Sequence, residues 1–177
     1  MVEKILFSEQ EIALCIERLA RQISEDYAGR DLVLVSILKG SVVFLSDLIR
    51  KITVPCSVDF MSISSYKNRA VSSGIVRLEL DLRETPEHKD LLLVEDILDS
   101  GLTLEYVLKN LKVRNLRSLR VCTLLDKPKK RKTNVRSDYT GFSIDDHFVV
   151  GYGLDYAEKF RNLPYIGILS KESQGKV

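Results

Sequence analysis

The sequence is poor in cysteine and histidine and has no long apolar run, and each shortage excludes a class of protein. Its three cysteines are an odd number without a CxxC pair, which argues against a disulfide framework and against a structural zinc site. His88 and His147 have no Asp or Cys partners at metal-ligand spacing, so both are expected at the surface. The longest apolar runs, such as that at 32–38, span only four to seven residues. A membrane-spanning helix needs roughly 18 or more, so none is expected.

Charge and length narrow the possibilities further. The chain has 177 residues and a net charge of +2, which is too mild to indicate nucleic-acid binding by itself. At roughly 150 residues per domain, this length predicts a single domain over residues 1–177. The first residues contain no apolar signal core, and the cysteine usage suits a reducing compartment, so we expect a cytoplasmic protein.

Helical periodicity and apolar runs alternate along the chain, which predicts an α/β fold with a mostly parallel central sheet flanked by helices. Ser8 and Glu11 form a capping-box pattern, and apolar residues at helical spacing follow until Gly29. Further helices are expected at about 42–49 and 102–112, and the segment 127–137 is expected to be a loop. Strands are predicted at 32–38, 57–64, 74–80, 91–94, 119–125, 148–150 and 165–169.

The most unusual segment is VEDILDSGLT, residues 94–103. Glu95 and Asp96 lie at the end of a buried strand, where carboxylates are costly unless a cation or hydrogen-bond donors receive them. A short loop then enters a helix, whose first backbone N–H groups attract phosphate. Since ligands of open α/β sheets bind beyond the carboxyl ends of the strands, the segment predicts a bound sugar phosphate. The plainer alternative is an ordinary capped helix with Ser100 or Thr103 as the N-cap.

This segment closely resembles the phosphoribosyl pyrophosphate signature of the type I phosphoribosyltransferases. Other segments resemble the bacterial hypoxanthine (hypoxanthine-guanine) branch of that family, and together they cover roughly residues 5 to 170. They are LKGS (38–41), SSY (64–66), DKP (126–128), FVVGYGLDY (148–156) and FRNLP (160–164). The resemblance implies the type I phosphoribosyltransferase fold, with a small hood formed by the terminal segments and a mobile lid loop at 65–73.

The resemblance also implies an activity. Members of this family transfer 5-phosphoribosyl from phosphoribosyl pyrophosphate to N9 of hypoxanthine or guanine, releasing pyrophosphate and giving IMP or GMP for purine salvage. They require Mg²⁺ and are usually homodimers or homotetramers. The implied metal-binding residues here are Glu95, Asp96 and Asp155. Asp99 is the implied catalytic residue, accepting or sharing a proton at purine N7.

The remaining substrate-binding residues are implied in the same way. Lys127 matches the lysine that donates to the purine 6-oxo group, and Phe148 matches the aromatic ring that stacks on the base. Glu95 and Asp96 would hold the ribose hydroxyls, and Leu38–Lys39 would be a cis peptide. The other positions are Lys39, Gly40 and Arg161 for pyrophosphate, Ser65 and Tyr66 in the lid, Ser100, Gly101, Leu102 and Thr103 for the 5′-phosphate, and Val149 and Asp155 for the base edge.

Two other functions stay open at this point. The run 127–132 has five cations in six residues and could belong to a regulator that senses phosphoribosyl pyrophosphate and binds RNA or DNA. Beside an anionic substrate the same run would steer anions inward, and Arg131 matches an arginine near the family's active site. The chain could also be a sister transferase for pyrimidines, adenine or xanthine, although Lys127 and the 148–156 string favour 6-oxopurines.

Overall fold

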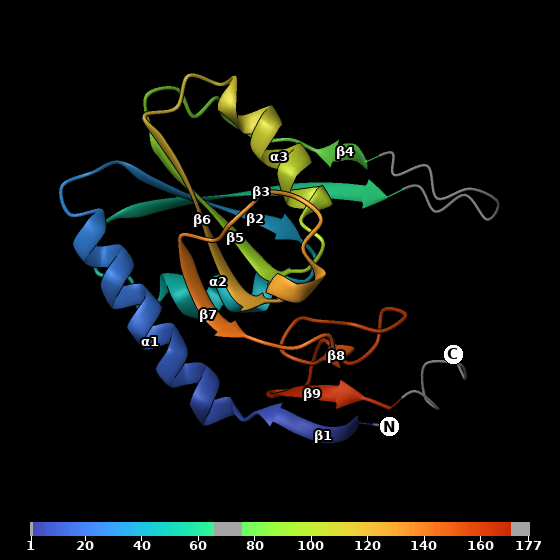
Figure 1. The fold of residues 1–177 in the computed structure, drawn as a ribbon. Coiled ribbons are helices and arrows are strands. Elements are labelled where there is room, and N and C mark those ends of the chain that lie inside the picture. The colour runs from blue at the N-terminus through green and yellow to red at the C-terminus, as the bar shows by residue number, and fades with distance from the viewer. Residues whose placement is uncertain (1, 66–75, 171–177) are drawn as a thin grey trace.

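A computed structural model describes residues 2–65 and 76–170 of the chain (Figure 1). Its main sheet has six strands in the order β4–β3–β2–β5–β6–β7. All neighbouring pairs are parallel except β3–β4, so the predicted α/β fold with a mostly parallel sheet is confirmed. The strands are β2 (Leu32–Leu38), β3 (Cys56–Ser65), β4 (Val76–Leu80), β5 (Asp90–Leu98), β6 (Ser118–Asp126) and β7 (Tyr139–Ser143).

Three α-helices flank this sheet in the described part of the chain, with α1 and α2 on one face and α3 on the other (Figure 1). The capping box at the start of α1 (Glu9–Asp26) is confirmed, because Ser8 and Glu11 bond reciprocally. Helix α2 spans Val42–Ile49 and α3 spans Leu102–Lys112. A short 3₁₀ helix, η1 (Pro128–Lys130), interrupts the segment predicted as a loop.

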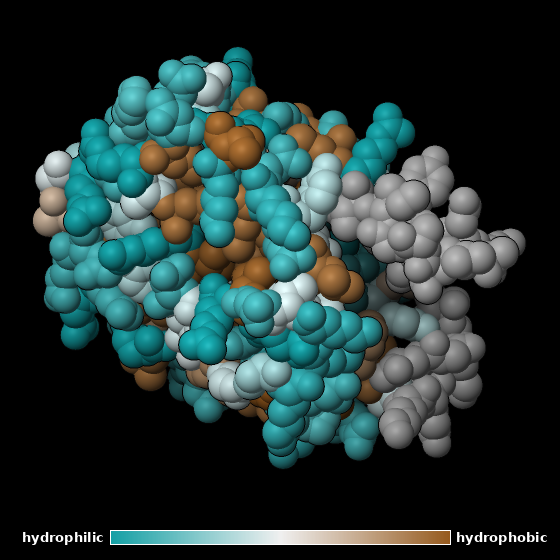
Figure 2. Space-filling view, turned by 45° about the horizontal axis from the view of Figure 1, so that its top comes forward, coloured by the Kyte–Doolittle hydropathy of each residue, from teal (hydrophilic) through white to brown (hydrophobic). Residues whose placement is uncertain are grey.

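The core consists of two apolar clusters, one on each face of the sheet. Strand β2 contributes to both, with Leu32 and Leu34 facing α1 and α2, and Val33 and Val35 facing α3. This explains its unbroken apolar run, since a parallel strand in the middle of a sheet is covered on both faces. Figure 2 shows mostly polar side chains on one face of the molecule, with an apolar strip among them. No helix in the described ranges combines the length and hydropathy needed to cross a membrane.

A second, antiparallel sheet forms the predicted hood. It contains β1 (Val2–Phe7), β9 (Ile166–Leu169) and β8 (Val149–Val150) in that order, so segments from both ends of the chain build it. In Figure 1 the hood lies beside the carboxyl ends of β5, β6 and β7. The space between the hood and these strand ends is therefore the place to look for a ligand site.

Two strands were missed by the sequence analysis, β1 and β7. Strand β1 mixes charged and apolar residues and has a partly exposed burial pattern, so it lacks the continuous run that marked β2. Strand β7 has a glycine at its centre, which weakens the sequence signal of a strand. The structure requires that glycine, because a Cβ at Gly141 would lie 2.4 Å from the carbonyl oxygen of Leu124.

Candidate active site

A cleft of about 490 Å³ lies between the hood and the carboxyl ends of β5 and β6. Six of the predicted site residues line it, although they are up to 59 positions apart in the sequence (155 − 96). They are Asp96, Asp99, Lys127, Phe148, Val149 and Asp155. Ile97, Lys130, Asp146 and Leu154 also line the cleft and were not predicted. Lys130 had a weak signal as part of the basic run, whereas Asp146 belongs to no motif.

The other predicted residues lie around this cleft or outside the described residues. Ser65 is the last residue of β3, where it pairs with Val76, and Tyr66 falls outside the described ranges together with most of the expected lid. Both histidines are exposed, as expected. The remaining positions are described below. They are Glu95 in β5, Lys39 and Gly40 after β2, Ser100 and Gly101 after β5, Leu102 and Thr103 at the start of α3, and Arg161 after β8.

Glu95 and Asp96 were expected to follow the strand, but they lie inside β5 near its carboxyl end, because the strand continues to Leu98. Their environment is unfavourable for negative charge. Burial raises the pKa of Glu95 well above its usual value, and the neighbouring Asp96 carboxylate raises it further. Burial also raises the pKa of Asp96 to about 6, although the N–H of Ile97 donates to its Oδ1 at 2.8 Å. Carboxylates held in this state favour a cation or hydroxyl donors as partners.

This donor set fits magnesium. No three His, Cys, Asp or Glu side chains in the described ranges are grouped so that they could hold a metal ion by themselves. Magnesium does not need such a group, because it takes one or two carboxylates and completes its shell with water and substrate phosphates. Asp96 and Asp155 face the same cleft and can supply those carboxylates.

The loop after β2 has the expected cis peptide between Leu38 and Lys39. Ser41 anchors this loop below the surface, where its hydroxyl lies 2.6 Å from that of Ser36. Gly40 contacts the turn that follows β8, because a Cβ at Gly153, whose φ is +96°, would lie 2.1 Å from the Gly40 carbonyl oxygen. The loop is thus fixed against the segment that carries Asp155.

The loop between β5 and α3 turns at Gly101, which has a φ of +83° and is the N-cap of α3. The alternative with Ser100 or Thr103 as the N-cap is therefore wrong. The Ser100 hydroxyl instead accepts from the N–H of Leu102 at 3.4 Å. Leu102 is half exposed, so its backbone rather than its side chain is placed to contribute to an anion site.

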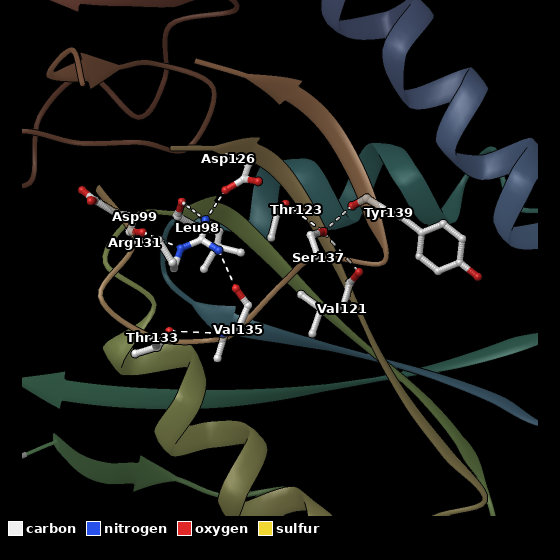
Figure 3. A network of polar contacts seen from close by, with 10 residues as sticks. All are labelled: Leu98, Asp99, Val121, Thr123, Asp126, Arg131, Thr133, Val135, Ser137 and Tyr139. Atoms are coloured by element: carbon white, nitrogen blue, oxygen red, sulfur yellow. Dashed lines mark hydrogen bonds and ion pairs between the residues drawn. The ribbon is translucent and has the colours of Figure 1, made fainter. Parts of the chain in front are cut away.

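Arg131 lies beside this loop and supports it (Figure 3). Its guanidinium donates to the carbonyl oxygens of Asp99, Leu98 and Val135 at 3.0, 3.3 and 2.6 Å, and it pairs with Asp126. Lys132 adds a backbone bond to the Ser100 carbonyl oxygen at 2.8 Å. Arg131 is not among the residues that line the cleft, and its hydrogen bonds hold the loop in place.

Four charged side chains meet at the base of the cleft. Lys130 Nζ lies 3.1 Å from Asp146 Oδ1 and 3.3 Å from Asp99 Oδ2. Lys127 Nζ lies 3.6 and 3.8 Å from the same two oxygens, and its side chain is only 6% exposed. The second oxygen of Asp99, Oδ1, is buried and has no hydrogen-bond partner among the described residues.

The segment after β8 completes the site. Asp155 pairs with Arg161 at 2.9 Å, and Arg161 also donates to the Gly153 carbonyl oxygen at 2.8 Å. Phe148 is 42% exposed where it lines the cleft, and Tyr156 meets its ring edge-on at 5.5 Å. An exposed aromatic face held in this way is suited to stacking on a planar base.

Comparison with known proteins gives the family. Residues 3–157 match the model described as "Phosphoribosyl transferase domain". The chain belongs to this family. It is 46% identical to the hypoxanthine-guanine phosphoribosyltransferase of Bacillus subtilis, over 95% of this chain and 93% of that protein. The crystal structure of a hypoxanthine phosphoribosyltransferase from Staphylococcus aureus superimposes with a TM-score of 0.93 at 47% identity, covering 97% of this chain and 93% of that one.

The chain also matches part of a much longer protein. The chain is 46% identical to the "Bifunctional protein TilS/HprT" of Listeria monocytogenes over 97% of its own length, but it spans only 26% of that protein. The matches to the Bacillus and Staphylococcus proteins, which cover nearly the whole of both chains, place it within the hypoxanthine-guanine branch of the phosphoribosyltransferases.

Proposed function

We propose that the protein transfers 5-phosphoribosyl from phosphoribosyl pyrophosphate to N9 of hypoxanthine or guanine, as a purine salvage enzyme. In this reaction the bond between ribose C1 and the pyrophosphate oxygen breaks, a bond from C1 to purine N9 forms, and the purine gives up one proton. The observation that carries the proposal is the cleft in which Asp99, Lys127 and Phe148 meet Asp96 and Asp155.

Base recognition is assigned to five residues that line the cleft. Phe148 stacks on the purine, and Lys127 donates to its 6-oxo group. The 6-amino group of adenine offers only donors there, so the ammonium of Lys127 would find no acceptor on that base and adenine would be rejected. Asp99 accepts or shares the proton at N7. Val149 contributes its backbone to the base edge, as does Asp155.

The sugar and the phosphates are assigned to the surrounding loops. Glu95 and Asp96 bind the ribose hydroxyls, and the loop from Ser100 to Thr103, with Gly101 and Leu102 between them, receives the 5′-phosphate on its backbone N–H groups. Lys39, Gly40 and Arg161 bind pyrophosphate, and Ser65 and Tyr66 close over the site. The transition state of the transfer has oxocarbenium character. These groups therefore accelerate the reaction by positioning the substrates and by stabilising the charges that develop.

Magnesium is the proposed cofactor, held by Asp96 and Asp155 with help from Glu95. When bound, it neutralises charge that develops on the leaving pyrophosphate. The elevated pKa of Asp96, about 6, supports this assignment, since a buried carboxylate is favoured by a nearby cation.

The alternative of a nucleic-acid-binding regulator is disfavoured by the contacts of the basic run. Lys127 and Lys130 pair with Asp99 and Asp146, Lys129 pairs with Asp145, and Arg131 bonds to the loop after β5. Four of the five cations are thus engaged within the chain.

We propose that the enzyme is cytoplasmic and that each chain is a single domain. We also propose that it forms a homodimer or homotetramer, and light scattering after gel filtration would test this oligomeric state.

The direct test is a panel of nucleobases, each supplied with phosphoribosyl pyrophosphate and Mg²⁺, with nucleotide and pyrophosphate both measured. Hypoxanthine or guanine should give equimolar nucleotide and pyrophosphate, and adenine and uracil should give neither. Excess chelator should abolish the reaction, and added Mg²⁺ should restore it. The proposal would be overturned if no 6-oxopurine led to the release of pyrophosphate.

A further inference from the structure

Two carboxylates lie near Lys127, and one of them, Asp146, has no assigned role. Within the described ranges, Asp99 and Asp146 are the two carboxylates within 4 Å of Lys127 Nζ, at 3.8 and 3.6 Å. Asp99 belongs to the chemistry of the purine proton. Asp146 is further along the chain, in the segment between β7 and β8, and no sequence motif pointed to it.

The backbone directs both lysines toward this second carboxylate. The N–H of Lys127 donates to the Leu98 carbonyl oxygen at 2.9 Å, and that of Lys130 donates to the Lys127 carbonyl oxygen at 3.1 Å. The short helix η1 therefore fixes the spacing of the two side chains. Asp146 is placed independently, because the N–H of Ile144 bonds to the Asp126 carbonyl oxygen at 2.8 Å and the Ile144 side chain is buried.

The partners of Lys127 matter because its side chain is almost entirely buried, at 6% exposure. A buried ammonium needs a charged or strongly accepting partner at every stage of the reaction. While one carboxylate oxygen of Asp99 interacts with N7 of the purine, its other oxygen is a weaker partner for Lys127 and Lys130. Asp146 is then the remaining carboxylate that can hold Lys127 in place.

We propose that Asp146 is a specificity-determining positioning residue, which holds the Lys127 ammonium against the 6-position of the purine while Lys130 links Asp146 to Asp99. This inference rests on the proposed function and deepens it. Without Asp146, Lys127 would turn toward Asp99 Oδ2, and the incoming base would meet a donor that is misplaced and partly neutralised. The loss should fall on the binding of the purine and not on that of phosphoribosyl pyrophosphate.

The adjacent residue offers a matched control. Asp145 pairs with Lys129 at 2.6 Å, and both side chains are well exposed, at 63% and 79%. Neither lines the cleft. Asp145→Asn therefore removes the same charge one position away and leaves the cluster of Lys127, Lys130, Asp99 and Asp146 untouched.

The test compares the steady-state kinetics of Asp146→Asn with those of Asp145→Asn and the wild type. Because Asp146 is half exposed, we expect Asp146→Asn to raise the KM for hypoxanthine and guanine by about five- to tenfold, with the KM for phosphoribosyl pyrophosphate unchanged. The preference for 6-oxopurines over adenine should fall by a similar factor. Asp146→Glu should recover part of the loss, and Asp145→Asn should match the wild type in every parameter.

A double-mutant cycle with Lys130→Met tests the link itself. If Lys130 acts through Asp146, then the double variant should be little worse for purine KM than the worse single variant. Fully additive effects would overturn the linkage, and equal changes in both Michaelis constants, or an Asp146→Asn enzyme indistinguishable from the wild type, would overturn the positioning role. These outcomes are separable from failure of the proposed function, in which the wild type itself would form no nucleotide.

Discussion

Gly40 lies directly against the carboxylate of Asp96: a Cβ at position 40 would fall 1.8 Å from Oδ2 and 2.8 Å from Cγ. The loop after β2 is therefore in close contact with the acid near the carboxyl end of β5, although 56 positions separate Gly40 from Asp96 (96 − 40). Because glycine has no side chain, the loop can approach Asp96 without displacing its carboxylate.

Replacing this glycine should damage the site more than the fold. In Gly40→Ala the new methyl group must push the Asp96 side chain aside, and we expect at least about a tenfold loss of kcat/KM for phosphoribosyl pyrophosphate because misplacement of about 1 Å has such effects. The control is Gly29→Ala, in a turn with φ of +71° and no atom within 4 Å of the added Cβ. That variant should lose about 1 kcal/mol of stability and no activity. Wild-type kinetics of Gly40→Ala would contradict the prediction.

Asp99 should be needed for turnover more than for binding. Asp99→Asn keeps the shape of the side chain but removes its ability to take a proton, and we expect kcat to fall about a hundredfold or more. The KM values for purine and phosphoribosyl pyrophosphate should change far less. Initial rates over a matrix of both substrates measure these effects separately. Full retention of kcat would exclude a role for Asp99 as the base.

Lys127 should act on the purine alone. Lys127→Met keeps much of the buried side-chain volume but removes the proposed donor to the 6-oxo group, so the KM for hypoxanthine and guanine should rise about tenfold or more. Lys129→Met is the control, because Lys129 is exposed and pairs with Asp145 outside the cleft. If the two variants gave the same purine KM, Lys127 would have no part in base recognition.

The sequence predicted the parts of the molecule in which local pattern and tertiary environment agree. The run 32–38 is apolar because β2 is covered on both faces, and the capping box at Ser8 is closed by residues only three positions apart. Strand β7 was missed because its local sequence pattern does not indicate its tertiary environment. Its pairing with β6 depends on Gly141 fitting against the Leu124 carbonyl oxygen, and no local signal reports a contact of that kind.

The same distinction applies to the site. Asp96, Asp99 and Lys127 were predicted because they belong to strings with a recognisable order, and the structure brings them to one cleft. Asp146 was missed because its importance comes only from its distance to two lysines on another loop. Arg131 was expected beside the active site, but its actual contacts with three backbone carbonyl groups follow from the path of the chain and not from its sequence context.

The contact between α1 and β7 predicts a pH-dependent difference in stability. The hydroxyl of Tyr139 donates to Asp26 at 2.6 Å and is the main cause of the lowered pKa of that carboxyl, with Arg120 adding to it at 2.8 Å. A lowered pKa contributes stability that is present at neutral pH and lost as the pH falls through the value in the folded protein.

Tyr139→Phe should therefore cost about 1 kcal/mol at pH 7, and the difference from the wild type should shrink as the pH falls below about 4. Urea unfolding at a series of pH values measures it. Tyr106→Phe, which removes a hydroxyl from α3 on the opposite face of the sheet, should show no such pH dependence. A difference that stays constant down to acidic pH would show that Asp26 is not the group involved.

Arg131 should stabilise the fold and position the proposed 5′-phosphate loop at the same time. Its side chain is 13% exposed, and its guanidinium donates to three carbonyl oxygens as well as to Asp126. Arg131→Met leaves these acceptors without their donor, so we expect a loss of about 2 to 4 kcal/mol in the free energy of unfolding. Because two of the acceptors belong to Leu98 and Asp99, the KM for phosphoribosyl pyrophosphate should rise as well.

Two further variants separate the geometry of Arg131 from its charge. Arg131→Lys keeps the charge but cannot supply the planar fork of donors, so it should recover only a minor part of the lost stability. Arg136→Met, at an exposed position in the same segment, should change the free energy of unfolding by no more than about 0.5 kcal/mol. Urea denaturation of the four proteins gives the comparison. If Arg131→Lys were as stable and as active as the wild type, then charge alone would be sufficient, and the hydrogen bonds to the loop would not be what holds it in place.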